Sequence, residues 1–104
     1  RIFLNPPYAQ PLVAQFCQKL IDGIVLGDVT EAIVLVNNAT ETTWFQLLLS
    51  RAKAMCFPQG RVKFLDPQGK PGAPLQGQAV IYFGENRDGF LDEFRKFGWG
   101  AILP

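Results

Sequence analysis

Blocks of apolar residues separated by polar turns predict an alternation of strands and helices along the chain. Residues 2–4 predict a short buried strand, and residues 32–36 form a nearly continuous β-branched run, typical of a strand covered on both faces. Between these strands, apolar side chains recur every four residues, at Leu12, Phe16, Leu20 and Ile24. This spacing predicts an amphipathic helix over residues 11–26, with Gly27 placed to end it.

The same reasoning predicts the rest of the chain. Helices are expected over residues 43–52, capped by Thr40 or Thr42, and over 88–96, capped by Asp88; strands are expected over 54–57, 61–65, 78–83 and 99–103. Three prolines and two glycines make residues 66–76 an irregular loop. The pattern therefore predicts one α/β domain with a mostly parallel sheet that ends in an antiparallel hairpin.

The order strand, helix, strand determines where the first polar loops lie. At this spacing the first two strands are expected to be parallel and joined by a right-handed crossover. Parallel strands end at the same edge of a sheet, which is where open α/β folds bind their ligands. Residues 5–8 and 37–40, which follow the two strands, are therefore expected side by side.

Composition narrows the class of protein. A chain of 104 residues with 48% hydrophobic content and a net charge of +1 predicts one globular domain and does not by itself indicate nucleic acid. There is no histidine, and Cys17 and Cys56 lack metal-ligand spacing, so we expect no metal and two buried free thiols in a reducing cytoplasm. No apolar run reaches the ~20 residues of a membrane span. Because the chain opens on a strand without a methionine, we expect a fragment of a longer protein.

Basic residues gather between residues 51 and 70. In this stretch five of them stand against a single acid, Asp66: Arg51, Lys53, Arg61, Lys63 and Lys70. Such a cluster fits either a solvated, loop-rich face or contacts to phosphates. Gly60-Arg61 has the same two interpretations, a hairpin with an exposed charge or an arginine turned toward a phosphate.

The tetrapeptide Asn5-Pro6-Pro7-Tyr8 is the strongest chemical signal in the sequence. Its prolines fix the backbone and donate no hydrogen bonds, which leaves nearby carbonyls available as acceptors. The amide oxygen of Asn5 and the carbonyl of Pro6 can then accept both hydrogens of an exocyclic amine, and Tyr8 offers a flat face on which a base stacks. The alternative is structural, because Pro-Pro also ends strands and Tyr8 can pack beneath the helix.

Residues after the second strand also have two interpretations each. Trp44 and Phe45 either pack in the core or contact an extruded base and neighbouring nucleic acid. Thr42, like Thr40 and Thr43, either caps a helix or binds a ligand.

Several stretches, in order, carry a family resemblance over nearly the whole chain. They are residues 3–8, Phe16 and Lys19, residues 34–36 leading into 42–45, residues 56–57 with 60–64, and residues 77–84. Together they resemble the bacteriophage-type DNA N6-adenine methyltransferase (Dam-like) family. The resemblance implies a partial Rossmann-like class I methyltransferase fold, S-adenosylmethionine as cofactor, double-stranded DNA as partner, and a phage or prophage origin with action in the cytoplasm of a bacterial or phage-infected cell. Enzymes of this kind flip the target base out of the duplex.

The resemblance also implies roles for individual residues. The predicted catalytic motif is Asn5, Pro6, Pro7 and Tyr8, and Asn5 is also expected to contact the cofactor. The predicted base contacts are Tyr8, Thr42, Trp44 and Phe45. The predicted phosphate contacts are Arg61 and Lys63, and no metal ligand is predicted.

Two features limit what the resemblance implies. Family members bind the cofactor largely through a segment upstream of the motif, so we expect the C-terminal catalytic fragment of a methyltransferase with part of the cofactor site. Gly98-Trp99-Gly100 precedes a strand with no following helix, so it is not a cofactor loop. Two other functions stay open: a methyltransferase of the same fold acting on protein glutamine or RNA guanine, and a non-enzymatic domain that binds nucleic acid or a partner chain.

Overall fold

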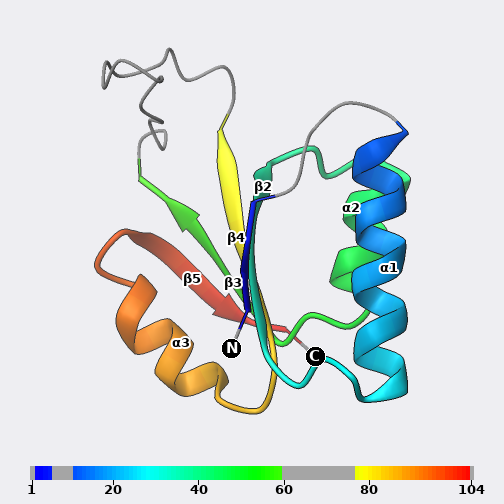
Figure 1. Cartoon of the computed structure of the whole chain (residues 1–104). Helices are drawn as coiled ribbons and strands as arrows, with labels where there is room; N and C mark the ends of the chain where they lie inside the picture. Colours follow the sequence, from blue (N-terminus) through cyan, green and yellow to red (C-terminus); the bar gives the residue numbers. More distant parts are fainter. Residues whose placement is uncertain (1, 6–10, 60–76, 104) are drawn as a thin grey trace, which may run out of the picture.

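A computed structural model describes residues 2–5, 11–59 and 77–103 of the chain. Within these ranges the elements follow in the order β1 (Ile2–Leu4), α1 (Leu12–Leu26), β2 (Ala32–Asn37), α2 (Thr43–Leu49), β3 (Ala54–Pro58), β4 (Gln78–Phe83), α3 (Arg87–Phe94) and β5 (Gly98–Ile102). The strands form one mixed sheet with the order β1-β2-β4-β3-β5 (Figure 1). The α/β class predicted from the sequence is therefore confirmed.

The prediction of a mostly parallel sheet is wrong. Only β1 and β2 pair in parallel, whereas β4 is antiparallel to both β2 and β3, and β3 is antiparallel to β5. The sequence misled because helices cover both faces of the sheet, and a strand buried on both faces is apolar throughout whatever its direction. Because β2 and β3 are both antiparallel to β4, the strands β1, β2 and β3 nevertheless point the same way.

The strand predicted over residues 2–4 is present, but the prediction that it is buried is wrong: β1 is an edge strand, and Ile2 and Phe3 are exposed. Most element boundaries agree with the sequence, and two differ. Helix α1 ends at Gly27, which has a left-handed φ of 84°, as expected. Helix α2 ends at Leu49 instead of continuing to residue 52. The cap of α3 is Asn86 and not Asp88, because the Asn86 side chain accepts a hydrogen bond from Gly89 N–H, and the helix ends at Phe94. The strand predicted over 61–65 and the loop predicted over 66–76 lie outside the described residues.

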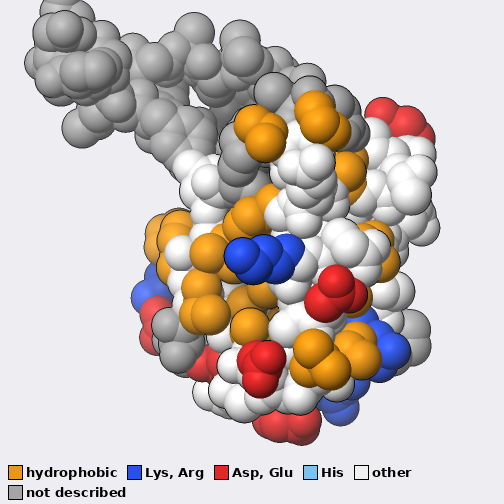
Figure 2. Space-filling view, turned by 45° about the vertical axis from the view of Figure 1, so that its right-hand side comes forward, with side chains coloured by type: hydrophobic (Ala, Val, Ile, Leu, Met, Phe, Trp, Pro, Cys, Tyr) orange, Lys and Arg blue, Asp and Glu red, His pale blue; other side chains and the backbone are white. Residues whose placement is uncertain are grey.

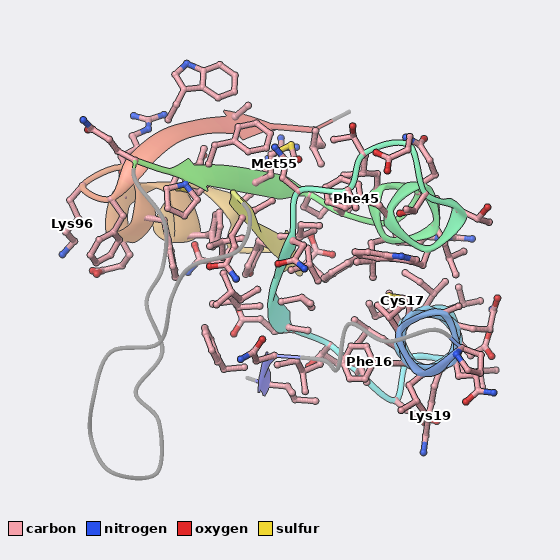
Figure 3. All side chains as sticks on the ribbon, turned by 90° about the horizontal axis from the view of Figure 1, so that it is seen from above. Phe16, Cys17, Lys19, Phe45, Met55 and Lys96 are labelled. Atoms are coloured by element: carbon pink, nitrogen blue, oxygen red, sulfur yellow. The ribbon has the colours of Figure 1, made fainter. Side chains whose placement is uncertain are left out.

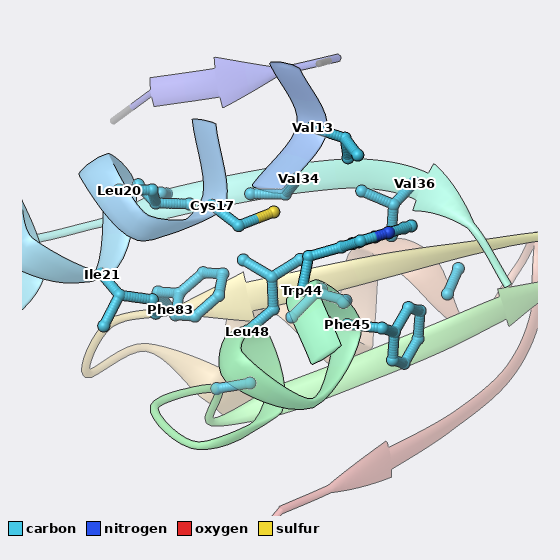
Figure 4. Packing of buried hydrophobic residues seen from close by; sticks show 14 residues of the cluster. Val13, Cys17, Leu20, Ile21, Val34, Val36, Trp44, Phe45, Leu48 and Phe83 are labelled. Atoms are coloured by element: carbon cyan, nitrogen blue, oxygen red, sulfur yellow. The ribbon is translucent and has the colours of Figure 1, made fainter. Parts of the chain in front are cut away.

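Two hydrophobic cores lie on opposite faces of the sheet. Helices α1 and α2 cover one face, and α3 covers the other (Figures 1 and 3). The α1/α2 core interleaves side chains from both helices with alternate residues of β2 and β4, including Val13, Cys17, Val34, Leu48 and Phe83 (Figure 4). The α3 core takes the intervening strand residues, including Ile33, Leu35, Val80, Tyr82 and Phe90.

The amphipathic character predicted for α1 is visible in side-chain direction. Cys17 points from the helix into the α1/α2 core, while Lys19 points away from the molecule (Figure 3). Cys17 and Cys56 are both buried and free, as predicted. None of the helices that the structure describes is long and apolar enough to span a membrane.

Candidate active site at the carboxyl edge of the sheet

Three strand ends meet at one edge of the sheet. The carboxyl ends of β1 and β2 lie there together with the start of β4 (Figure 1). Asn5 follows β1 and is exposed, and Asn37 ends β2, directly opposite Gln78. The parallel register, in which Leu4 pairs with Val34, confirms that the loops after the first two strands leave the same edge. The register places Asn5 level with Leu35, two residues before Asn37, and Gln78 directly opposite Asn37, so the three carboxamides lie toward the same edge of the sheet.

Hydrogen bonds fix the segment that follows β2. Asn38 N–H donates to Gly77 O over 3.0 Å, which extends the β2–β4 ladder by one bond. Ala39 O then accepts from both the backbone N–H and the hydroxyl of Thr42, over 3.1 and 2.7 Å. The Gln46 side chain donates to Thr40 O over 2.8 Å. The segment that follows β2 at this edge is therefore an ordered turn.

The residues predicted to bind the base from this segment have structural roles. Thr42 is the N-cap of α2, since its Oγ1 accepts from Phe45 N–H over 3.3 Å, which confirms the capping interpretation. Trp44 and Phe45 are 7% and 0% exposed and their ring centroids lie 5.8 Å apart (Figure 4). Both rings pack in the α1/α2 core, which is the structural interpretation. A binding role for Thr42, Trp44 or Phe45 stays a prediction.

Several predicted site residues cannot be placed relative to this edge. Pro6, Pro7, Tyr8, Arg61 and Lys63 all lie outside the described residues. Their predicted roles in base stacking, amine binding and phosphate contact stay predictions.

Two members of the basic cluster lie at the other end of the sheet. Arg51 and Lys53 precede β3 and line a hollow of about 310 Å³ together with Gly84 and Glu85, which follow β4. Since β3 points the same way as β1, the start of β3 lies at the edge opposite Asn5. On the face shown in Figure 2, basic and acidic side chains are interspersed with apolar ones, without a continuous basic stripe.

Gln78 is a feature of this edge that sequence reasoning missed. It is the buried polar residue of the described chain, with 8% of its surface exposed. Among the described residues, no hydrogen-bond partner reaches its buried Oε1. The sequence analysis placed Gln78 at the start of an apolar strand and gave it no role. The available signal was a polar carboxamide at a strand position that is expected to be buried.

The Gly-x-Gly near the end of the chain has a packing role. Gly98 and Gly100 belong to β5 and pair with Pro58 and Cys56. A Cβ at Gly98 would collide with the backbone carbonyl of Phe57, so glycine permits the close approach of β3 and β5. This segment was predicted not to be a cofactor loop, and it forms a strand. Among the described residues no group of three or more His, Cys, Asp or Glu side chains could hold a metal ion.

Comparison with known proteins identifies the family. A family model described as DNA N-6-adenine-methyltransferase (Dam) matches residues 1–84, which span Asn5, the Asn37–Thr42 turn, Gln78 and the whole of β4. No curated protein and no solved structure gave a match. Since the model covers most of the sequence, the chain belongs to the DNA N6-adenine-methyltransferase (Dam) family.

Proposed function

We propose that the protein takes part in the transfer of a methyl group from S-adenosylmethionine to the N6 amine of an adenine flipped out of double-stranded DNA. The observation that carries this proposal is the family match together with the position of Asn5. Asn5 is exposed at the end of β1, at the edge where ligands of open α/β sheets bind. We further propose that the sheet belongs to a Rossmann-like methyltransferase fold, which the shared direction of β1, β2 and β3 supports.

Asn5 suits the handling of a neutral amine. A carboxamide oxygen accepts a hydrogen bond at every ordinary pH and does not remove a proton. By accepting one N6 hydrogen, with the Pro6 carbonyl as the proposed second acceptor, Asn5 would hold the amine so that its nitrogen lone pair faces the methyl donor. The amide dipole would also stabilise the positive charge that develops on N6 as the nitrogen–carbon bond forms and the methyl carbon–sulfur bond of the donor breaks, leaving a neutral thioether, and the proton would then leave to water. Orientation accounts for catalysis in this scheme.

The residues at this edge fit an uncharged reaction site. Asn5, Asn37 and Gln78 offer hydrogen-bond acceptors and donors without a formal charge. S-adenosylmethionine would supply an electrophilic methyl group there, and Asn5 is the described residue that we propose contacts both this cofactor and the amine.

Two other functions make different predictions. A methyltransferase of the same fold that acts on protein glutamine or RNA guanine would use the same carboxamide on another planar amine. A non-enzymatic domain would bind nucleic acid or a partner chain with an affinity that does not depend on Asn5 or on the cofactor. The family match favours DNA adenine over both.

The test is transfer of labelled methyl from S-adenosylmethionine to unmethylated duplex DNA, followed by nucleoside analysis. It is run with the 104-residue chain and with the longest natural chain that contains it, each as wild type and as Asn5→Ala. Gln18→Ala is the control, because Gln18 is an exposed carboxamide on α1 that bonds only to a neighbouring surface residue, Asp22.

We expect label in N6-methyladenine, a loss of about 100-fold or more in Asn5→Ala, as when one preorganised hydrogen-bond partner is removed, and full activity in Gln18→Ala. If DNA is not methylated, and label enters glutamine or guanine when protein or RNA is supplied in its place, the assignment moves to the corresponding methyltransferase. DNA binding without transfer in the longest chain, unchanged by Asn5→Ala and by cofactor, would support the non-enzymatic alternative.

A further inference from the structure

The burial of Gln78 is unusual because its side-chain oxygen has no hydrogen-bond partner in the part of the chain that the structure describes. The side chain is 8% exposed, and its Oε1 is shielded with no hydrogen-bond partner among the described residues. Buried polar groups in folded proteins are nearly always hydrogen-bonded, and an unpaired one destabilises the fold. A leucine would fill the same place without this penalty, so the stability of the fold does not explain the carboxamide.

The strand register places Gln78 next to the candidate active site. It begins β4 opposite Asn37, and the bond from Asn38 N–H to Gly77 O continues the ladder past this pair. Alternation along β4 puts Gln78 on the same face as Val80 and Tyr82, which is the face covered by α3. Alternation along β2 puts Asn37 on this face with Leu35.

Asn5 shares this face and edge. Phe3 lines the groove between the sheet and α3 together with Ile33 and Tyr82, and Asn5 is two residues further along the same direction. The strand β1 is separated from β4 only by β2. A planar ligand bound across the end of β2 would therefore have Asn5 on one side and Gln78 on the other.

A carboxamide is the side chain that matches the edge of adenine. Adenine presents the ring-nitrogen acceptors N1 and N7 on either side of its amine, and a glutamine NH₂ can donate to one of them while Asn5 and the Pro6 carbonyl hold the two N6 hydrogens. A half-turn of the amide brings the NH₂ to the buried position of Oε1, from which it can donate to a ring nitrogen of the base. We propose that Gln78 is a specificity-determining residue that hydrogen-bonds the edge of the target adenine, next to the amine held by Asn5. This inference rests on the proposed function.

The first test compares activity with stability in Gln78→Leu. If Gln78 serves the substrate, the leucine variant will keep or raise the thermal midpoint, because a buried unpaired oxygen is removed, while kcat/KM for adenine methylation falls about 10- to 100-fold, the discrimination of one good base contact. Gln18→Leu, the same substitution on the exposed face of α1, leaves both quantities unchanged. Full kcat/KM in Gln78→Leu, or a parallel fall of midpoint and activity, would overturn the inference.

The second test asks which atom of the base Gln78 contacts. DNA substrates carry 1-deazaadenine or 7-deazaadenine at the target position, each lacking one ring-nitrogen acceptor. For the wild type, kcat/KM should be about tenfold lower on one of the two analogues than on adenine. For Gln78→Leu, kcat/KM should be the same on that analogue and on adenine, because the contact is already absent. Equal losses in the wild type and the variant on both analogues would show that Gln78 does not read this edge.

The third test does not depend on activity. The side-chain NH₂ signals of Gln78, assigned by their absence in Gln78→Leu, are followed by NMR during addition of a thymine oligonucleotide with or without one adenine. A shift with the adenine-containing strand only is expected, and unmoved signals at saturation would refute the contact. Absence of methyl transfer in the wild type would refute the proposed function separately, because it leaves this comparison intact.

Discussion

The hydroxyl of Tyr82 donates a 2.6 Å hydrogen bond to Oε2 of Glu31, the residue just before β2. The same hydroxyl accepts a bond of 2.9 Å from Asn86 N–H, and Asn86 caps α3. Tyr82 is 1% exposed and its ring stacks on Phe90 at a centroid distance of 5.0 Å. One buried hydroxyl on β4 thus connects the start of β2 with the start of α3.

Replacing Tyr82 with Phe should destabilise the fold without opening a cavity. The change removes both bonds and leaves the Asn86 N–H without this acceptor, so we expect a loss of about 1–3 kcal/mol in the free energy of unfolding, measured by urea denaturation. Glu31→Gln retains an acceptor for the hydroxyl and should cost less than about 1 kcal/mol. A Tyr82→Phe variant as stable as the wild type would show that the hydroxyl network contributes nothing.

Thr42→Ala tests the capping role of this residue against a role in binding. Loss of the Oγ1 acceptor for Phe45 N–H should lower the free energy of unfolding by about 1 kcal/mol. Thr42→Ser keeps the hydroxyl and should stay within about 0.5 kcal/mol of the wild type. If Thr42→Ser lost methyl transfer while remaining stable, the residue would have a function beyond the cap.

Phe45→Ala tests whether this ring belongs to the core. Because Phe45 is fully buried, the truncation should cost about 3–5 kcal/mol, measured as the free energy of unfolding in urea. Phe97→Ala is the matched control, since that ring is 56% exposed and its removal should cost about 1 kcal/mol or less. Equal costs for the two variants would contradict the packing described for the α1/α2 core.

Two glycines should differ in their tolerance of alanine for different reasons. At Gly98 a Cβ meets the backbone of Phe57, Pro58 and Gln59, and we expect Gly98→Ala to cost about 3 kcal/mol or more because β3 and β5 must separate. At Gly27 there is open space around the Cβ but a φ of 84°, so Gly27→Ala should cost only about 1 kcal/mol. Thermal unfolding of both variants shows which substitution lowers the stability more. A larger loss in Gly27→Ala than in Gly98→Ala would contradict the close approach of β3 and β5.

Cys17 makes the stability sensitive to alkaline pH. Burial raises the pKa of its thiol from the ordinary 9.0 to about 11, because the thiolate is disfavoured in the core. Above pH 9 the unfolded chain loses this proton and the folded chain keeps it, so stability falls between pH 9 and 11, by about 2 kcal/mol at pH 11. Cys17→Ala lacks this group, and its unfolding free energy should fall less steeply over the same range. Parallel pH profiles for the two proteins would contradict the assignment.

The sequence predicted the described elements well because their signals are local. The four-residue recurrence from Leu12 to Ile24 and the apolar runs of β2 and β4 depend only on neighbouring positions. The direction of β4 and its insertion between β2 and β3 depend on contacts far apart in sequence, which no local pattern encodes. The cap of α3 was misassigned because Asn86 and Asp88 are both good cap residues, and the turn geometry decides between them.

For the candidate site, the sequence predicted the position of Asn5 and the loop after β2, since both follow from one parallel strand pair. It did not identify Gln78. This residue lies opposite Asn37 only because β4 runs antiparallel to β2, and the sequence did not predict that direction. The sequence also did not determine whether Trp44 and Phe45 are buried, because aromatic side chains occur both in cores and on binding surfaces.

The central position of β4 also constrains how the chain acquires its structure during synthesis. Strands β2 and β3 are made before β4 but never touch, so on the ribosome neither has its sheet partner on that side until residues 78–83 emerge. The sheet therefore closes late, when β4 joins β2 to β3 and β5 then pairs with the outer edge of β3. A nascent chain stopped before residue 78 would expose the inner edge of β2 and both edges of β3, and unpaired strand edges favour aggregation.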